Sequence, residues 1–220
     1  MEAETVAAII TGITGVVGVV VGSFIPLLQT WWSNRSKVEK DTAYLAVMVV
    51  AHLDQLANGC VACALDDGTE YGRPAGKDGI EHVTTTSTPD FKPFDINVDW
   101  KVLPRDLMYA ILDLPNKSQR IQNRLAGLAE FSDDFPDHGD FFSARQRGYA
   151  DLSLQVFDIA RKLREHAGMP FEQRNPDDWD VALEMRERIK KIDEAEAAHR
   201  KRLSEQDWPP TPSVPESSGG

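Results

Sequence analysis

The feature that most constrains this chain is an uncharged apolar segment near its N-terminus. Residues 5–32 contain no Asp, Glu, Lys or Arg. A helix rises about 1.5 Å per residue, so the roughly 20 apolar residues at 6–25 match a hydrocarbon core about 30 Å thick. Trp31 and Trp32 follow, where aromatic side chains anchor a helix at the membrane interface. The sequence therefore predicts a transmembrane helix over residues 5–32.

A cleaved signal peptide and a buried core helix are the alternatives for this segment. A signal peptide has a basic start, a short apolar stretch and a small-residue cleavage site. Here Glu2 and Glu4 precede the segment, and its end is bulky and aromatic. A core helix is shorter and less evenly apolar. These differences favour an uncleaved membrane anchor.

Flanking charges predict how the anchor is oriented. Arg35, Lys37 and Lys40 follow the segment closely, whereas only acidic side chains precede it. The positive-inside rule then places residues 33–207 in the cytoplasm and residues 1–4 on the outer side of the membrane. We expect Arg35 and Lys37, with the two tryptophans, to form the membrane-interface anchor.

Small residues recur every fourth position inside the predicted anchor. Thr14, Gly18 and Gly22 would share one face of the helix, and small side chains allow two helix backbones to approach closely in lipid. Glycine is also common in transmembrane helices in general, which is the simpler explanation. The pattern favours association between copies of the chain through this face.

Composition limits the classes of partner and of compartment. The 220 residues carry a formal net charge of −11. An acidic surface repels phosphate backbones, so nucleic acid is not an expected partner. Two cysteines close together do not form the disulfide framework of a secreted domain.

Residues 33–207 read as one mainly α-helical domain. A stripe with three-and-four spacing predicts a first helix over residues 38–65; its members are Leu45, Val49, His52, Leu56, Cys60 and Cys63. Later helices are expected around residues 104–114, 121–128 and 149–163, with a last one from Asn175. We predict an antiparallel bundle of three to five helices.

Two segments depart from this helical pattern. Residues 66–101 contain many glycines and then alternate between apolar and polar side chains from Phe94 to Trp100, which predicts an extended strand. This strand either pairs with residues 83–88 as a small hairpin or stands alone. The Pro- and Ser-rich residues 208–220 are predicted to be a disordered tail. The expected fold is thus a transmembrane helix and a helical bundle with a small extended or β insertion at 66–101.

Motifs for chemistry are weak. Cys60 and Cys63 form a CxxC pair, but the pair lies near a helix end where the dipole does not favour thiolates, so core packing is favoured. The row Asp95, Asn97 and Asp99 lacks the glycine and glutamate that complete a calcium loop. An acidic loop over residues 132–140 is unspecific for metal. No catalytic, cofactor-binding or metal-binding residue is therefore assigned.

Three functions remain open from the sequence. The leading hypothesis is a non-enzymatic, membrane-anchored protein that associates with itself in the lipid bilayer and presents a helical interaction module to a cytosolic protein. The second is a holin-like or toxin-like oligomer that perturbs the membrane. The third is an enzyme whose site is assembled near residues 66–101, with His52, His82 and the row from Asp95 to Asp99 as the first candidates.

Overall fold

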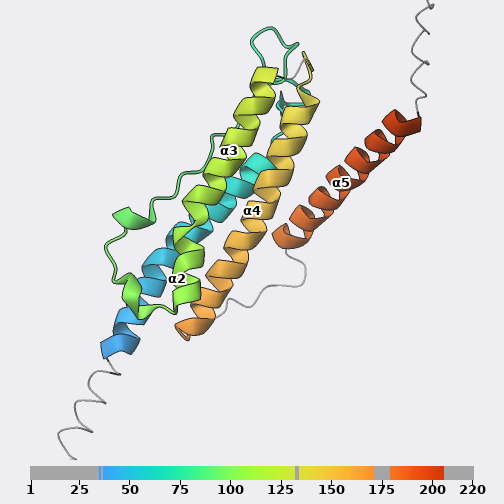
Figure 1. Ribbon diagram of the computed structural model, residues 1–220. Helices are drawn as coiled ribbons and strands as arrows, with labels where there is room; N and C mark the ends of the chain where they lie inside the picture. Colours follow the sequence, from blue (N-terminus) through green and yellow to red (C-terminus); the bar gives the residue numbers. More distant parts are fainter. Residues whose placement is uncertain (1–34, 36, 132–133, 171–178, 206–220) are drawn as a thin grey trace, which may run out of the picture. The chain divides into compact units, whose positions relative to one another are not determined.

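Helices make up most of the described structure, as predicted. The computed structural model describes residue 35 and residues 37–131, 134–170 and 179–205 (Figure 1). Its helices are Lys37–Leu65, α2 (Arg105–Leu112), α3 (Leu114–Phe131), α4 (Gly139–His166) and α5 (Val181–Glu205). The predicted transmembrane segment, residues 5–32, and the predicted tail, residues 208–220, lie outside the described residues.

The helix Lys37–Leu65 buries one apolar stripe. Leu45, Val49, Leu56 and Cys60 are almost fully buried, as their spacing predicts. The placement of His52 on this stripe was wrong, because His52 is exposed and Leu53, four residues after Val49, takes the buried position. The helix is also long and apolar enough to cross a membrane by length and composition, a property that core helices of soluble domains share.

The described residues belong to two compact units, and long helices contribute to both. Among the described residues, the first unit consists of residue 35, residues 37–55, Asp90–Pro115 and residues 156–170. Its buried side chains come from the first helix, from α2 with the segment before it, and from the end of α4; they include Leu45, Val49, Ile96, Leu103, Ile111, Ile159 and Leu163. An ion pair of 2.5 Å between Arg164 and Asp54 joins two of these elements.

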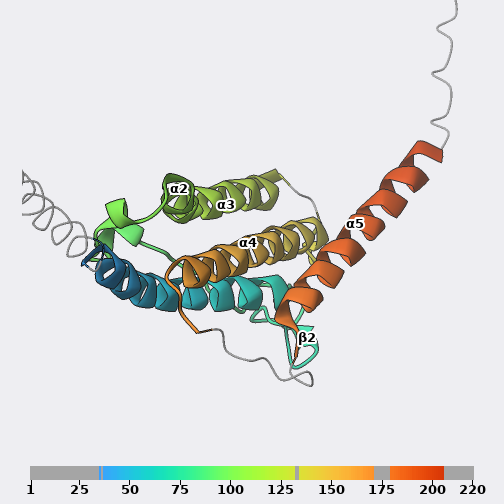
Figure 2. The same cartoon turned by 90° about the horizontal axis from the view of Figure 1, so that it is seen from below.

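Among the described residues, the second unit consists of Leu56–Pro89 and residues 116–131, 134–155 and 179–205. Within it α3 and the first half of α4 lie side by side (Figures 1 and 2). They are antiparallel, since Lys117 near the start of α3 bonds Gln155, whereas Ile121 one turn later lies against Gly148. A methyl group on Gly148 would meet the Ile121 side chain at 3.1 Å, so the glycine permits this close approach.

The predicted insertion contains strands, but not where the sequence placed them. A two-stranded antiparallel sheet pairs β1 (Thr69–Glu70) with β2 (Arg73–Pro74). The predicted strand from Phe94 to Trp100 was wrong, because two 3₁₀ helices, η1 (Pro93–Asp95) and η2 (Trp100–Val102), begin and end this stretch and residues 96–99 between them form no strand.

Local backbone chemistry explains this difference. Proline fixes φ near the helical value at the first position of η1. Asp99 accepts a hydrogen bond from the Lys101 backbone N–H and so caps η2. The alternating pattern therefore marks two tight turns that bury Ile96 and leave Phe94 exposed.

The predictions for α4 are confirmed. Its apolar face is buried at Tyr149, Leu152, Val156, Ile159 and Leu163. Gly168 follows the end of the helix with φ at +63°. The backbone N–H of Met169 donates to the carbonyl oxygen of Arg164, and that of Gly168 donates to the carbonyl oxygen of Glu165. This is a Schellman motif, which favours glycine because its left-handed residue carries no Cβ strain.

Candidate functional site

The most buried polar cluster of the second unit centres on Asp66 and Arg145. Asp66 directly follows the first helix, and Arg145 projects from the second turn of α4. The Arg145 Nη1 atom donates to Asp66 Oδ2 at 2.8 Å, and the two side chains are 3% and 0% exposed. A buried ion pair persists only where further hydrogen bonds satisfy both groups.

Neighbouring groups satisfy both partners. The carboxylate of Asp66 accepts bonds from the backbone N–H groups of Gly68, Thr85 and Thr86 and from both threonine hydroxyls, at 2.9–3.1 Å. Burial by itself raises the pKa of Asp66, but these hydrogen bonds outweigh it and hold the pKa below its usual value. Arg145 also donates to the Thr86 carbonyl oxygen at 2.9 Å.

This cluster fixes the segment 66–89 against α4. Because both charged groups are enclosed and their bonds are internal, the cluster serves to hold the fold and offers no accessible surface for a ligand.

The two cysteines join the same core. Cys60 and Cys63 are free thiols and fully buried, as predicted. Burial raises the pKa of Cys60 to about 12 and also raises that of Cys63, despite the Arg145 guanidinium 3.4 Å from its sulfur. Raised pKa values leave both thiols protonated and unreactive at neutral pH.

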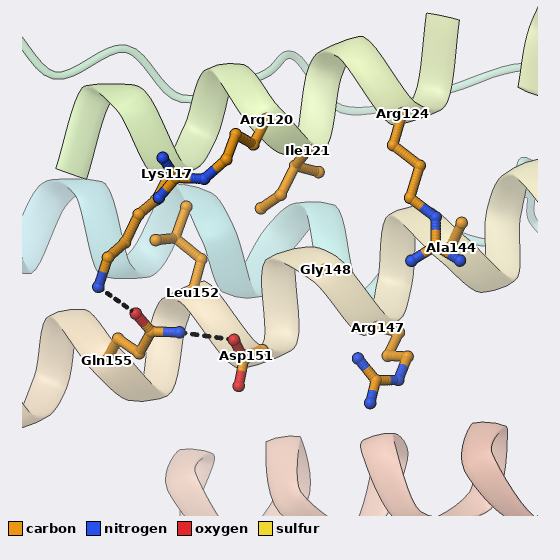
Figure 3. Close-up of a pocket in the computed structure, with 10 residues that line it drawn as sticks. All are labelled: Lys117, Arg120, Ile121, Arg124, Ala144, Arg147, Gly148, Asp151, Leu152 and Gln155. Atoms are coloured by element: carbon orange, nitrogen blue, oxygen red, sulfur yellow. Dashed lines mark hydrogen bonds between the residues drawn. The ribbon is translucent and has the colours of Figure 1, made fainter. Parts of the chain in front are cut away.

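A basic groove lies on the exposed side of the second unit, between α3 and α4 (Figure 3). Its volume is about 300 Å³. The polar side chains that line it are Lys117, Arg120, Arg124, Arg147, Asp151 and Gln155, and the apolar floor is formed by Ile121, Ala144, Gly148 and Leu152. Four cationic groups thus face one carboxylate.

Hydrogen bonds fix the positions of several of the polar side chains that line the groove. Lys117 Nζ donates to Gln155 Oε1, and Gln155 Nε2 donates to Asp151 Oδ2, both at 2.6 Å (Figure 3). Arg147 pairs with Asp193 of α5 at 2.6 Å. Among the residues that the structure describes, Arg124 has no ion-pair partner, and its guanidinium extends from α3 toward α4 (Figure 3).

An apolar face is exposed on the first helix, within the first unit. Tyr44, Val47 and Met48 are 61%, 55% and 38% exposed, and Ala51 is exposed beside them. Positions i, i+3, i+4 and i+7 lie on one side of a helix, so the four side chains form a continuous stripe. We call these four residues the exposed stripe.

The residues predicted for membrane association are only partly described. Thr14, Gly18, Gly22, Trp31 and Trp32 lie outside the described residues. Arg35 and Lys37 are exposed at the start of the first helix.

Candidate metal and catalytic residues do not converge. Within the described ranges, no group of three or more His, Cys, Asp or Glu side chains is placed to hold a metal ion. His52 and the Asp95 to Asp99 row belong to the first unit, whereas His82 belongs to the second and its Nδ1 lies 3.1 Å from the Asp67 carbonyl oxygen. The basic groove is lined by none of them.

Sequence reasoning missed both the buried ion pair and the groove. A signal for the groove was present, since Lys117, Arg120 and Arg124 follow i, i+3, i+7 spacing, but the helix predicted around residues 121–128 did not include Lys117 and Arg120. The ion pair had no local signal, because 79 positions separate its partners.

The sequence matches no protein-family model, and no curated protein or solved structure is significantly similar to it. The function is therefore inferred from the residues and their geometry.

Proposed function

We propose that this chain is a single-pass membrane protein that associates with itself and presents a cytosolic helical interaction module. The anchor is the uncharged segment at residues 5–32, and residues 33–207 form the module as an antiparallel bundle. The cytosolic orientation rests on Arg35, Lys37 and Lys40.

The exposed stripe is the observation that supports the proposed self-association. It lies on the helix that begins directly after the predicted anchor, where two anchors in contact would bring two first helices together. Val47 and Met48 are exposed to water in the described structure. Burying them against another apolar surface is favourable by about 25 cal/mol for each Å² of apolar surface removed from water. A parallel pair of these helices would continue the contact that Thr14, Gly18 and Gly22 begin in the membrane.

Cysteine crosslinking in isolated membranes tests this proposal. We expect Met48→Cys to give a covalent dimer on mild oxidation, and Gly18→Leu with Gly22→Leu to reduce its yield. Arg161→Cys, an exposed position on α4, is the matched control. The unsubstituted chain should give no dimer, because its two cysteines are buried.

Two results would contradict the proposal. A chain that alkaline carbonate releases from membranes is not anchored by residues 5–32. Equal dimer yields from Met48→Cys and Arg161→Cys would mean that the exposed stripe does not meet a second copy.

A further inference from the structure

The basic groove concentrates positive charge on a chain whose formal net charge is −11. Three of its cations come from one face of α3, and Arg147 comes from the facing turn of α4 (Figure 3). Asp151 supplies the one negative charge of the lining, and Asp193 of α5, outside the lining, pairs with Arg147. Like charges held this close repel one another, and a bound anion relieves that repulsion.

We propose that this groove binds a small ligand that carries two or more phosphate groups. The space available is the first reason. A volume of about 300 Å³ is at the lower end of small-molecule sites and admits a diphosphate group with a short organic portion. Carboxylates on a peptide are spread along the chain, whereas linked phosphates place several charges within one such space.

The type of cation is the second reason. Three of the four are arginines, whose planar guanidinium groups donate paired hydrogen bonds to phosphate oxygens. Arg124 is the principal ligand in this proposal, because no described residue neutralises it and its side chain extends across the groove. Lys117 is already oriented by its 2.6 Å bond to Gln155 and adds a point charge at the other end.

The floor and the acceptors suggest what else the ligand carries. Ile121 and Leu152 give the groove an apolar base, in which Gly148 lies in close contact with Ile121. Asp151 and Gln155 offer acceptor oxygens for a hydroxyl or amine group. The site therefore favours a phosphorylated molecule with an organic portion over inorganic phosphate alone.

A second groove extends the positive surface toward α5. It shares Arg124 and Ala144 with the first groove and adds two cations, Lys191 and Arg200, beside two carboxylates, Asp140 and Glu196. Its volume is about 600 Å³, so a longer polyphosphate or a larger headgroup can bridge both grooves at Arg124.

Titration calorimetry on the full chain in micelles of an uncharged detergent tests the inference. Pyrophosphate and adenosine triphosphate are the probes. A charge-assisted hydrogen bond contributes enough that Arg124→Gln should weaken their binding about tenfold. Arg186→Gln is the matched control, since Arg186 is an exposed arginine of α5 that lines neither groove and its loss changes net charge equally.

Competition measurements distinguish a lipid headgroup from a soluble molecule as the source of the phosphate groups. Vesicles that contain phosphatidylinositol bisphosphate, whose headgroup carries more than one phosphate, serve as the lipid probe. Competition with pyrophosphate would assign the groove to a lipid headgroup, and failure to compete would assign it to a soluble ligand; both outcomes support recognition of several phosphates. The inference is overturned if none of these probes shows saturable binding. Equal weakening by Arg124→Gln and Arg186→Gln, or tighter binding of oligoglutamate than of pyrophosphate, also overturns it. None of these outcomes depends on self-association in the membrane.

Discussion

Replacing Arg145 with methionine tests whether the buried ion pair holds the second unit together. Methionine keeps much of the side-chain length but removes the guanidinium that bonds Asp66 at 2.8 Å and the Thr86 carbonyl oxygen at 2.9 Å. The carboxylate then loses its counter-charge while fully enclosed. Breaking one partner of a buried pair costs about 3–5 kcal/mol. Because domains are stable by about 5–15 kcal/mol, Arg145→Met should remove a large part of the total.

Urea denaturation of the full chain, followed by far-ultraviolet circular dichroism, measures this cost. The control is Arg161→Met on the same helix, where the arginine is half exposed and pairs with Asp158 and Glu165. Surface pairs contribute about 0–1 kcal/mol, so the control should lose little. The two variants losing equal free energy of unfolding would refute the structural role of the buried pair.

A double variant sharpens the measurement. Asp66→Asn alone should also destabilise the chain, since an amide carries no charge opposite Arg145 and directs N–H groups toward other donors. Groups in direct contact couple, so Asp66→Asn with Arg145→Met should cost about 2 kcal/mol less than the sum of the single changes. Additive costs would show that the two groups act independently.

Two further predictions concern the same unit. Gly68 and Gly72 both have φ near +75°, but a methyl group on Gly68 would overlap the Phe142 ring, whereas one on Gly72 meets nothing within 4 Å. Gly68→Ala should therefore lower the free energy of unfolding in urea by about 1–3 kcal/mol more than Gly72→Ala, because of overpacking. The pKa of Asp66 is lower in the folded chain than in the unfolded one. Its ionised carboxylate therefore stabilises the fold above about pH 4, and this stabilisation is lost as the pH falls through the pKa of Asp66 in the folded chain. The difference in unfolding free energy between the unsubstituted chain and Asp66→Asn should shrink on acidification, and a difference that stays constant with pH would contradict this.

The helices were predictable because their signal is local. The buried residues of α4, from Tyr149 to Leu163, follow helical spacing, and Gly168 ends the helix where glycine is favoured. The same kind of signal failed at residues 94–100. Alternation over so few residues suits a strand as well as two tight turns, and Pro93 and the capping Asp99 favour the turns.

What the amino-acid sequence alone determined is the apolar segment at residues 5–32, the mainly helical character and the buried stripes, since each depends on neighbours a few positions apart. Tertiary structure decided the rest. Asp66 meets Arg145 across 79 positions, and the basic groove needs α3 and α4 to lie antiparallel at close range. A charge acquires its role from the groups that surround it in space, and those groups are brought together only by packing.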